Sequence, residues 1–336
     1  MKILLLTTAF TLFSSSVQSQ NFSTFKITGG AAPNVVNTYT KEKMEVTTTQ
    51  LLRQIDSTPK GYKTDSIPFE LNLKSIDASQ KAKETLKQLW KYYALRVIGS
   101  NLEDILLIDG DEYQVRNIKV QRFLQEAPAE CFDTTQISIN FNKRGEIVDI
   151  NTVMNNQQYD KILKDAKSVE DEFNRKQILY WMDCLRTAYN TKNKAFFDDI
   201  LSPDALIITG KRTWRRERRD DNMLIVQNFT YSVQDKWQYI KKLESIFLKN
   251  SYLNIEFGDD AEIFRNGGNQ RYYAVEVTQY WNSSSYSDEG RLFVIWDFGP
   301  KERNSKAKYP QILYRVWQHP DDAKRFGFGD FKLSKE

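Results

Sequence analysis

The single histidine of this 336-residue chain, His319, is the first candidate for catalytic chemistry. A Ser-His-Asp or Cys-His site would have to use its imidazole as the base. His319 ends a strand-like segment and stands directly before Pro320, near the C-terminus, which favours a structural or surface role. A histidine-rich metal centre is excluded, and the cysteines have no metal-ligand spacing. We therefore expect no metal and no cofactor.

Polar side chains set among apolar neighbours in strand-like segments are a second group of candidates. They are Glu276, Tyr280, Asp297 and Arg315, with Trp296 next in sequence and Tyr239 from a helical segment. A carboxylate enclosed by aromatic rings has a raised pKa and can act as a general base. Alternatively, Asp297 and Arg315 form an ion pair on adjacent strands or face water, because successive strand residues point to opposite faces. The predicted pocket is bounded by Tyr239, Tyr280, Trp296, Asp297 and Arg315.

A basic cluster surrounds Trp214 in the long connection between a predicted strand and a predicted helix. It consists of Lys211, Arg212, Arg215, Arg216, Arg218 and Arg219. It could bind a polyanion such as a phosphorylated glycan or lipid headgroups. Glu217, Asp220 and Asp221 dilute the charge, so we favour a solvated loop. The whole chain has 48 basic against 44 acidic residues, a net charge of +4, which is too weak for a nucleic-acid partner.

The first 19 residues have the layout of a secretory signal peptide. Lys2 is followed by an apolar run, Ile3 to Phe13, then by serines and Val17-Gln18-Ser19 before Gln20. An N-terminal membrane anchor is the alternative, but the run is short for a bilayer, and no later stretch is long and apolar enough to span one. We expect export, to the periplasm or outside the cell. Export permits a disulfide between Cys131 and Cys184, although we favour two unpaired thiols.

The segment after the leader divides into a lead-in and a small domain. Residues 20–74 are rich in Thr, Asn and Lys and predict an extended lead-in with short strands at most. Residues 75–168 predict an α+β domain with one long helix, 78–97, which Asp77 or Ser75 caps. About four antiparallel strands follow as two hairpins, 105–108 with 113–120 and 136–141 with 146–150.

Residues 170–320 predict a second domain, and residues 321–336 an aromatic tail that folds back onto it. Helical periodicity marks 173–189, 195–200 and 235–249. Strand patterns mark 205–209, 253–264 with a bend at Gly258, 272–281, 291–298 and 311–317. Three helices packed on a curved antiparallel sheet make a cone-shaped α+β fold with a cavity.

Two stretches carry a family resemblance. Residues 196–207 read FFDDILSPDALI, and residues 281–298 read WNSSSYSDEGRLFVIWDF. With the order of elements, they resemble the nuclear transport factor 2-like (SnoaL-like) superfamily, of the kind found in exported Bacteroidetes proteins. The resemblance implies a pocket between helices and concave sheet, where catalytic members place an Asp, Tyr or His. It also implies a possible homodimer through the C-terminal sheet. Residues 78–106 echo 177–201, so a degenerate second copy of the fold is an open alternative.

Two functions from different classes fit these features. The first is an exported, non-catalytic binding or assembly module whose partner is an unknown small molecule, glycan or protein. The second is a small-molecule isomerase, dehydratase or cyclase that uses a carboxylate and a tyrosine in the cone. Because one fold can host both, the cavity decides. A deep cavity lined by Asp297, Tyr280 or Tyr239 favours the enzyme, and a cone filled by large side chains favours the binding module.

Overall fold

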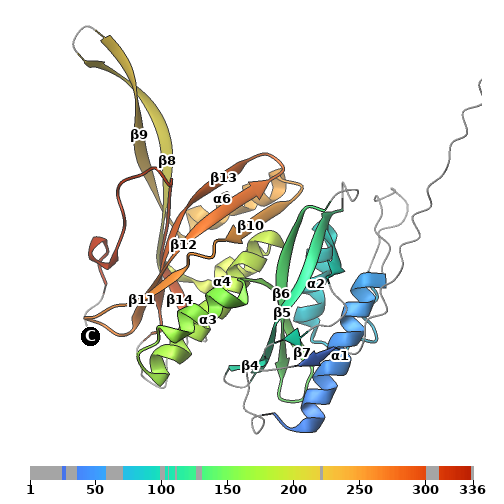
Figure 1. Cartoon of the computed structure of the whole chain (residues 1–336). Helices are drawn as coiled ribbons and strands as arrows, with labels where there is room; N and C mark the ends of the chain where they lie inside the picture. Colours follow the sequence, from blue (N-terminus) through green and yellow to red (C-terminus); the bar gives the residue numbers. More distant parts are fainter. Residues whose placement is uncertain are drawn as a thin grey trace, which may run out of the picture.

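The computed structural model describes residues 25–27, 36–57, 71–98, 103–104, 106–109, 112–125, 131–219, 222–299 and 310–333. These residues form an α+β structure with an N-terminal and a C-terminal unit packed side by side (Figure 1). The predicted signal peptide and the turn residue Gly110 lie outside the described residues.

The N-terminal unit is built on an antiparallel sheet in the order β2-β5-β6-β7, with β4 also paired to β5. Its strands are β2 (Tyr93–Val97), β4 (Leu106–Asp109), β5 (Glu112–Leu124), β6 (Asp133–Asn142) and β7 (Ile147–Val153). A short parallel pair, β1 (Lys26–Ile27) with β3 (Glu103–Asp104), lies beside it. Both predicted hairpins are present as β4–β5 and β6–β7, and Gly145 takes the positive φ of 74° that the second turn requires.

Two helices, α1 (Thr38–Ser57) and α2 (Gln80–Tyr92), complete the core of this unit. The predicted extended lead-in was wrong for α1, whose Met44, Leu51 and Ile55 are buried. The predicted end of the second helix at Val97 was also wrong, because residues 93–97 pair with β5 as strand β2. Ser79, rather than Asp77 or Ser75, caps α2 by accepting a hydrogen bond from the amide of Ala82.

The C-terminal unit packs four helices on one face of a mixed sheet. The helices are α3 (Asn156–Lys164), α4 (Val169–Asn190), α5 (Lys194–Ile200) and α6 (Lys236–Lys249). The sheet order is β10-β12-β13-β14-β8-β9, with β11 paired to β12. The strands are β8 (Leu201–Arg219), β9 (Asn222–Asp235), β10 (Leu253–Phe257), β11 (Glu262–Arg265), β12 (Tyr272–Ser283), β13 (Ser287–Asp297) and β14 (Gln311–Gln318). The sheet is not wholly antiparallel, since β14 and β8 run parallel. The helix α3 was not predicted.

The region predicted as a solvated loop is a long β-hairpin. Strands β8 and β9 pair from Leu206 with Asp235 to Arg219 with Asn222. Their distal part stands away from the body as a two-stranded arm (Figure 1). The basic cluster therefore lies along β8, and its residues alternate between the two faces of a strand.

The C-terminal residues cover the outer face of this sheet, opposite the helices. Tyr272, Phe293 and Tyr314 point outward from the sheet, and Phe326, Phe328, Phe331 and Leu333 of the tail pack against them. The Tyr314 hydroxyl donates a hydrogen bond to the Lys332 carbonyl at 3.0 Å. The expected fold-back of the aromatic tail is thus present, and it covers one face of the sheet through which a homodimer was expected.

A polar interface joins the two units. Arg116 of β5 is fully buried and donates hydrogen bonds to the Asp183 carboxylate of α4 at 2.8 Å and to the Met154 carbonyl at 2.9 Å. Glu256 of β10 accepts hydrogen bonds from both Arg122 and Arg186. Because these partners come from both sheets and from α4, the second face of the N-terminal sheet is covered by the C-terminal unit.

Candidate functional site

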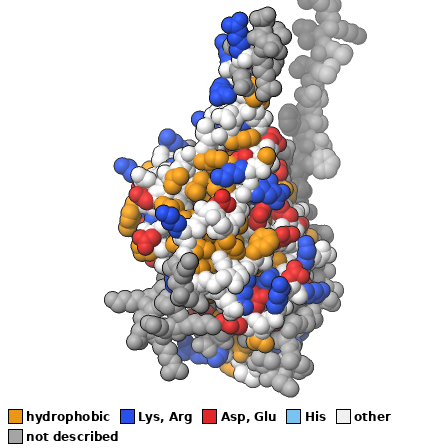
Figure 2. Space-filling model, turned by 90° about the vertical axis from the view of Figure 1, so that its left-hand side faces the viewer, with side chains coloured by type: hydrophobic (Ala, Val, Ile, Leu, Met, Phe, Trp, Pro, Cys, Tyr) orange, Lys and Arg blue, Asp and Glu red, His pale blue; other side chains and the backbone are white. Residues whose placement is uncertain are grey.

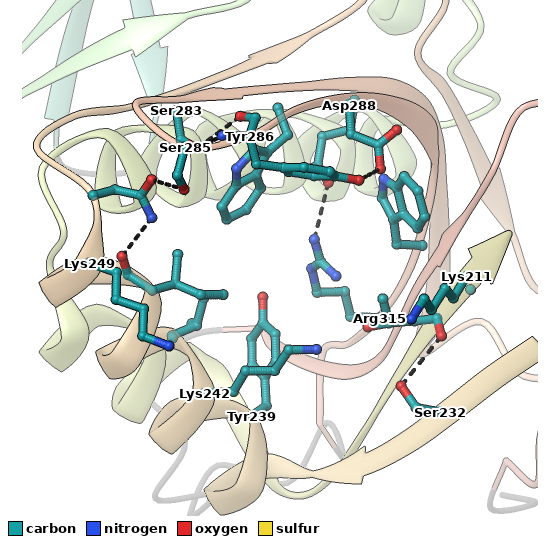
Figure 3. Close-up of a pocket in the computed structure, with 18 residues that line it drawn as sticks. Lys211, Ser232, Tyr239, Lys242, Lys249, Ser283, Ser285, Tyr286, Asp288 and Arg315 are labelled. Atoms are coloured by element: carbon teal, nitrogen blue, oxygen red, sulfur yellow. Dashed lines mark hydrogen bonds between the residues drawn. The ribbon is translucent and has the colours of Figure 1, made fainter. Parts of the chain in front are cut away.

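A cavity of about 490 Å³ opens between α6 and the concave face of the sheet (Figure 3). One face of α6 contributes Tyr239, Lys242, Leu243, Ile246 and Lys249, at the three- and four-residue spacing of one helix face. The sheet side contributes Gln279, Trp281, Ser283, Ser285, Tyr286, Asp288, Arg315 and Trp317, and the base of the β8–β9 hairpin contributes Thr209, Gly210, Lys211 and Ser232. The volume is in the range of small-molecule sites.

Arg315 lies at the inner side of this cavity and is only 5% exposed. Its Nη2 donates a hydrogen bond to Gln279 Oε1 at 3.1 Å, and its Nε has no hydrogen-bond partner. The guanidinium carbon lies 5.5 Å from the ring centre of Tyr239 and 5.9 Å from that of Tyr189. Within the described part of the chain no carboxylate forms an ion pair with it. Arg315 is therefore a buried cation held by an amide and two aromatic rings.

A tyrosine pair borders the arginine. The hydroxyls of Tyr239 and Tyr189 are hydrogen-bonded to each other, and both side chains are buried. Burial raises the pKa of Tyr239 well above its ordinary value, because the charged phenolate would lose its hydration. Tyr239 thus keeps its proton at neutral pH and presents a neutral hydroxyl to the cavity (Figure 3).

The mouth of the cavity is basic. Lys211, Lys242 and Lys249 line it together with the inner Arg315, against one lining carboxylate, Asp288. Asp288 accepts a hydrogen bond from the hydroxyl of Tyr286, which is 57% exposed. Partial burial, and secondarily repulsion by Arg315, lower the pKa of Lys242 from its ordinary value. Four cations against one anion give the lining a positive field.

The predicted pocket residues do not come together. Tyr239 and Arg315 line the cavity, but Trp296 is fully buried in the core and Tyr280 is 43% exposed on the other face of the sheet. The predicted couple of Asp297 and Arg315 was wrong, because the register pairs Asp297 with Gln311 and places Arg315 opposite Val294.

Asp297 has a different ionic partner. Its carboxylate accepts hydrogen bonds from the Arg271 side chain and, at 2.7 Å, from the Gly299 amide. The Asp297 side chain is 15% exposed and lies outside the cavity lining. Glu276 also faces away from the cavity and pairs with Arg291 at 3.3 Å and Arg325 at 3.1 Å. Neither carboxylate is placed to act on a ligand in the cavity.

Several lining residues escaped the sequence analysis. Lys242 and Lys249 resembled the solvated face of an amphipathic helix, and Trp281 and Trp317 resembled core residues. Gly290 lies inside β13, although the predicted strand began only at residue 291, and a glycine inside a strand indicates close approach of another group. A Cβ atom built there would lie 2.3 Å from Trp317 Cε2, so the indole rests on the glycine and forms part of the cavity wall.

The remaining candidates from the sequence lie elsewhere. His319 Nδ1 accepts a hydrogen bond from the Asp321 amide at 3.2 Å, and its ring lies 5.7 Å from that of Phe229. Cys131 is exposed, Cys184 is buried, and the two are unpaired. The described residues contain no cluster of three or more side chains suited to hold a metal ion. Across the same residues, none of the helices combines the length and apolar character that a bilayer crossing needs.

No protein-family model and no curated protein matches the chain. Solved structures match part of it. An NTF2-like protein of unknown function in nutrient uptake from Rhodospirillum rubrum is 15% identical, covering 42% of this chain and 97% of that one, with a TM-score of 0.30. An NTF2-like superfamily protein from Salmonella enterica is 11% identical, covering 47% and 96%, with a TM-score of 0.31.

A protein from Bdellovibrio bacteriovorus is 11% identical and matches over 66% of this chain and 94% of that one, with a TM-score of 0.32. The predicted resemblance to NTF2-like proteins is thus found again among solved structures, over part of the chain. At these identities and TM-scores no family, ligand or activity of this chain follows from the likeness.

Proposed function

We propose that the chain is a binding module whose C-terminal cavity holds a small organic anion, a carboxylate with an apolar body. The observation that carries the proposal is Arg315, a cation 5% exposed at the inner side of a 490 Å³ cavity, with Gln279 as its side-chain hydrogen-bond partner. A guanidinium removed from water is costly unless it is paired. An anionic ligand would supply the missing partner.

The guanidinium geometry favours a carboxylate. Arginine presents five N–H donors in a planar fork that matches the two oxygens of a carboxylate. One donor of Arg315 is used by Gln279, and Nε is without a partner. Charge-assisted bonds to the remaining donors would be shorter and stronger than neutral ones.

The walls favour an apolar body behind the carboxylate. Leu243, Ile246, Trp281 and Trp317 line the cavity between α6 and the sheet. Pockets of this kind bind ligands mainly through apolar contact, and a few polar groups fix the orientation. Lys242 and Lys249 at the mouth would attract an anion before it reaches Arg315. The expected ligands are aromatic or medium-chain carboxylic acids.

The enzymatic alternative has less support. The cavity is open and Tyr239 lines it, as that alternative requires, but Asp297 and Tyr280 do not. Among the lining residues, Asp288 is the one carboxylate, and the Tyr286 hydroxyl occupies it. Tyr239 holds its proton because burial raises its pKa. The lining thus offers no free carboxylate to abstract a proton from a ligand beside Arg315, which supports binding over proton transfer.

A ligand screen with matched pairs tests the proposal. Melting temperatures of the full chain would be measured with aromatic and medium-chain carboxylic acids and with the corresponding amides, which keep the shape but lack the charge. We expect acids to raise the melting temperature and amides to have little effect. Equal stabilisation by both would contradict an anion site.

Two arginine variants serve as opposite controls. Arg315→Met removes a buried cation that lacks a carboxylate partner, so the free protein should be as stable or up to about 2 kcal/mol more stable, while the response to acids is lost. Arg271→Met breaks the pair with Asp297 outside the cavity, so it should destabilise the protein and leave the response to acids intact. The reverse pattern would sink the assignment of Arg315.

We also propose that the mature protein is exported. The support is the signal-peptide pattern of residues 1–19, with Lys2, an apolar run and Val17-Gln18-Ser19. N-terminal sequencing of the protein recovered outside the cytoplasm should begin at or near Gln20. Recovery of intact Met1 on that protein would rule out cleavage.

A further inference from the structure

The β8–β9 hairpin continues beyond the sheet as an arm, defined here as residues 210–219 and 222–231. Strand β14 pairs with β8 only as far as Trp317 with Thr209, and beyond that point β8 and β9 pair with each other alone. Figure 1 shows the distal part of the arm standing clear of both units, whereas near its base the Phe229 ring lies 5.7 Å from that of His319. A two-stranded ribbon is marginally stable in water, so an arm of this length is best explained by something that lies against it.

The two faces of the arm differ. The register and the two-residue period place Arg212, Trp214, Arg216 and Arg218 on one face with Ile225, Gln227 and Phe229 opposite them, which we call the outer arm face. The other face carries Lys211, Thr213 and Arg215 with Val226, Asn228 and Thr230. The aromatic groups Trp214 and Phe229 therefore share the outer arm face with three of the cations, Arg212, Arg216 and Arg218.

The outer arm face exposes apolar and cationic groups side by side. The exposed fraction is 62% for Trp214 and 68% for Ile225. The Arg212 guanidinium lies 5.6 Å from the Trp214 ring, and Arg216 is exposed on the same face, two residues beyond Trp214 along β8. Figure 2 shows Lys and Arg side chains gathered on the described part of the projection. Arg212 also forms an ion pair with Asp321 at 3.6 Å, so its charge is already partnered. Arg216 is therefore the better residue to mutate in a test of the outer arm face.

We propose that the outer arm face binds the surface of an anionic lipid membrane. Arginines attract lipid phosphates, while tryptophan and other apolar side chains insert at the boundary between headgroups and acyl chains. An acidic polysaccharide would satisfy the arginines and could stack on Trp214, but it would leave Ile225 in water. The pairing of cations with Trp214 and Ile225 on one face thus favours a membrane. This inference is independent of the ligand in the cavity.

Two neighbouring arginines of the arm provide a matched test. Arg216 and Arg215 are both exposed and adjacent, but they lie on opposite faces of β8. Arg216→Glu and Arg215→Glu change the net charge equally. Binding of the full-length chain would be measured by co-sedimentation with phosphatidylcholine vesicles, with and without phosphatidylglycerol. Near-ultraviolet dichroism would check that both variants keep the fold of the parent.

We expect the parent to bind the phosphatidylglycerol vesicles and not the neutral ones, and to release them at high salt. Arg216→Glu should lower the partition by about tenfold or more, and Arg215→Glu by much less. Brominated acyl chains should quench tryptophan fluorescence of the parent, and Trp214→Ala should remove most of that quenching. Absence of binding, equal losses in the two variants, or binding to a soluble sulfated polysaccharide without lipid quenching would each overturn the proposal.

Discussion

At the scale of single residues, Arg315 has the properties of a binding group more than those of a structural one. Structural arginines of this chain are paired with carboxylates, as Arg116 is with Asp183 at 2.8 Å. Arg315 instead has Gln279 and the faces of Tyr189 and Tyr239. This environment tolerates the cation without neutralising it, which leaves the charge available to an incoming anion.

The protonation of Lys242 should make ligand binding at this site depend on pH. Desolvation, and secondarily repulsion by Arg315, lower the pKa of Lys242 below its ordinary value of 10.5. Protonated Lys242 therefore lowers the stability of the ligand-free folded protein. This loss of stability is relieved as the pH rises through the lowered pKa towards 10.5. A bound carboxylate reverses this effect, because it stabilises the protonated lysine. We expect proton uptake on binding at alkaline pH, and an affinity that falls as pH rises through the lowered pKa.

Calorimetric titration in buffers of different ionisation enthalpy measures that proton uptake. Lys242→Met should remove it, whereas Lys241→Met, on the neighbouring residue outside the cavity lining, should preserve it. Proton release on binding, or a pH dependence that survives Lys242→Met, would contradict the placement of the anion.

The sequence pattern along the strands identified Arg315 and Asp297 as polar residues among apolar neighbours. It does not indicate which residues they contact on neighbouring strands. That depends on register, and a bulge between Ile295 and Trp296 shifts it. Arg271, the true partner of Asp297, comes from the turn before β12 and carried no signal of its own. Local pattern thus located the polar exceptions, whereas their partners came from strand pairing between distant segments.

At the scale of elements, the cavity wall depends on a contact between β13 and β14. The indole of Trp317 rests on Gly290, where an added Cβ would lie 2.3 Å from it. We expect Gly290→Ala to cost about 1–3 kcal/mol of stability and to push Trp317 into the cavity, which weakens binding of acids. Gly267→Ala is the control, because no atom lies within 4 Å of a Cβ added there. Calorimetric melting with and without acid measures both effects, and intact binding in Gly290→Ala would show that Trp317 does not bound the ligand.

The tail is a second element with a testable role. Phe331 lies 4.4 Å from Tyr314 and 6.1 Å from Phe293 between ring centres, so the tail shields the outer face of the sheet. A homodimer through this face would require the tail to leave. We expect truncation after Arg325 to cause concentration-dependent self-association, measured by analytical ultracentrifugation, and truncation after Leu333 to cause none. A shortened chain that stays monomeric would show that the covered face is not adhesive.

The elements that periodicity predicted well are those with strong one-sided burial, such as α4, α6 and the β6–β7 hairpin. The misses have physical causes. Thr47, Thr48 and Thr49 are buried in α1, and β-branched residues of low helix propensity concealed that helix. The β8–β9 arm is charged on both faces, so its strands lack the alternation of apolar and polar residues that marks a half-buried strand.

At the scale of the whole molecule, the two units are tied together by buried charges. Asp171 of α4 pairs with Arg175 of the same helix. Asp183 of α4 pairs instead with Arg116 from the other unit, and the side chains of Asp183 and Arg116 are almost fully buried. A fragment from residue 170 onward, which begins where the sequence predicts the second domain, would lose Arg116 and also α3, whose Tyr159 and Ile162 belong to the C-terminal core.

We therefore expect the full chain to unfold in one calorimetric transition. Arg116→Met leaves Asp183 buried without its cation, which should cost about 3–5 kcal/mol and shift that single transition as a unit. Burial already raises the pKa of Asp183, so the loss should shrink as pH falls and the carboxylate is protonated. Adding Asp183→Asn should recover part of the loss. Two separate transitions, with one unaffected by Arg116→Met, would show independent units.

We have proposed that the cavity between α6 and the sheet holds an anion on Arg315. A crystal structure of the full chain with a bromine-labelled aromatic acid tests it most directly, because the anomalous signal of bromine locates the ligand. We expect the ring to lie between Leu243 and Trp281, with the carboxylate in hydrogen-bond contact with the Arg315 guanidinium. A ligand bound elsewhere, or one whose carboxylate points to solvent and leaves the Arg315 guanidinium without a carboxylate partner, would contradict this placement.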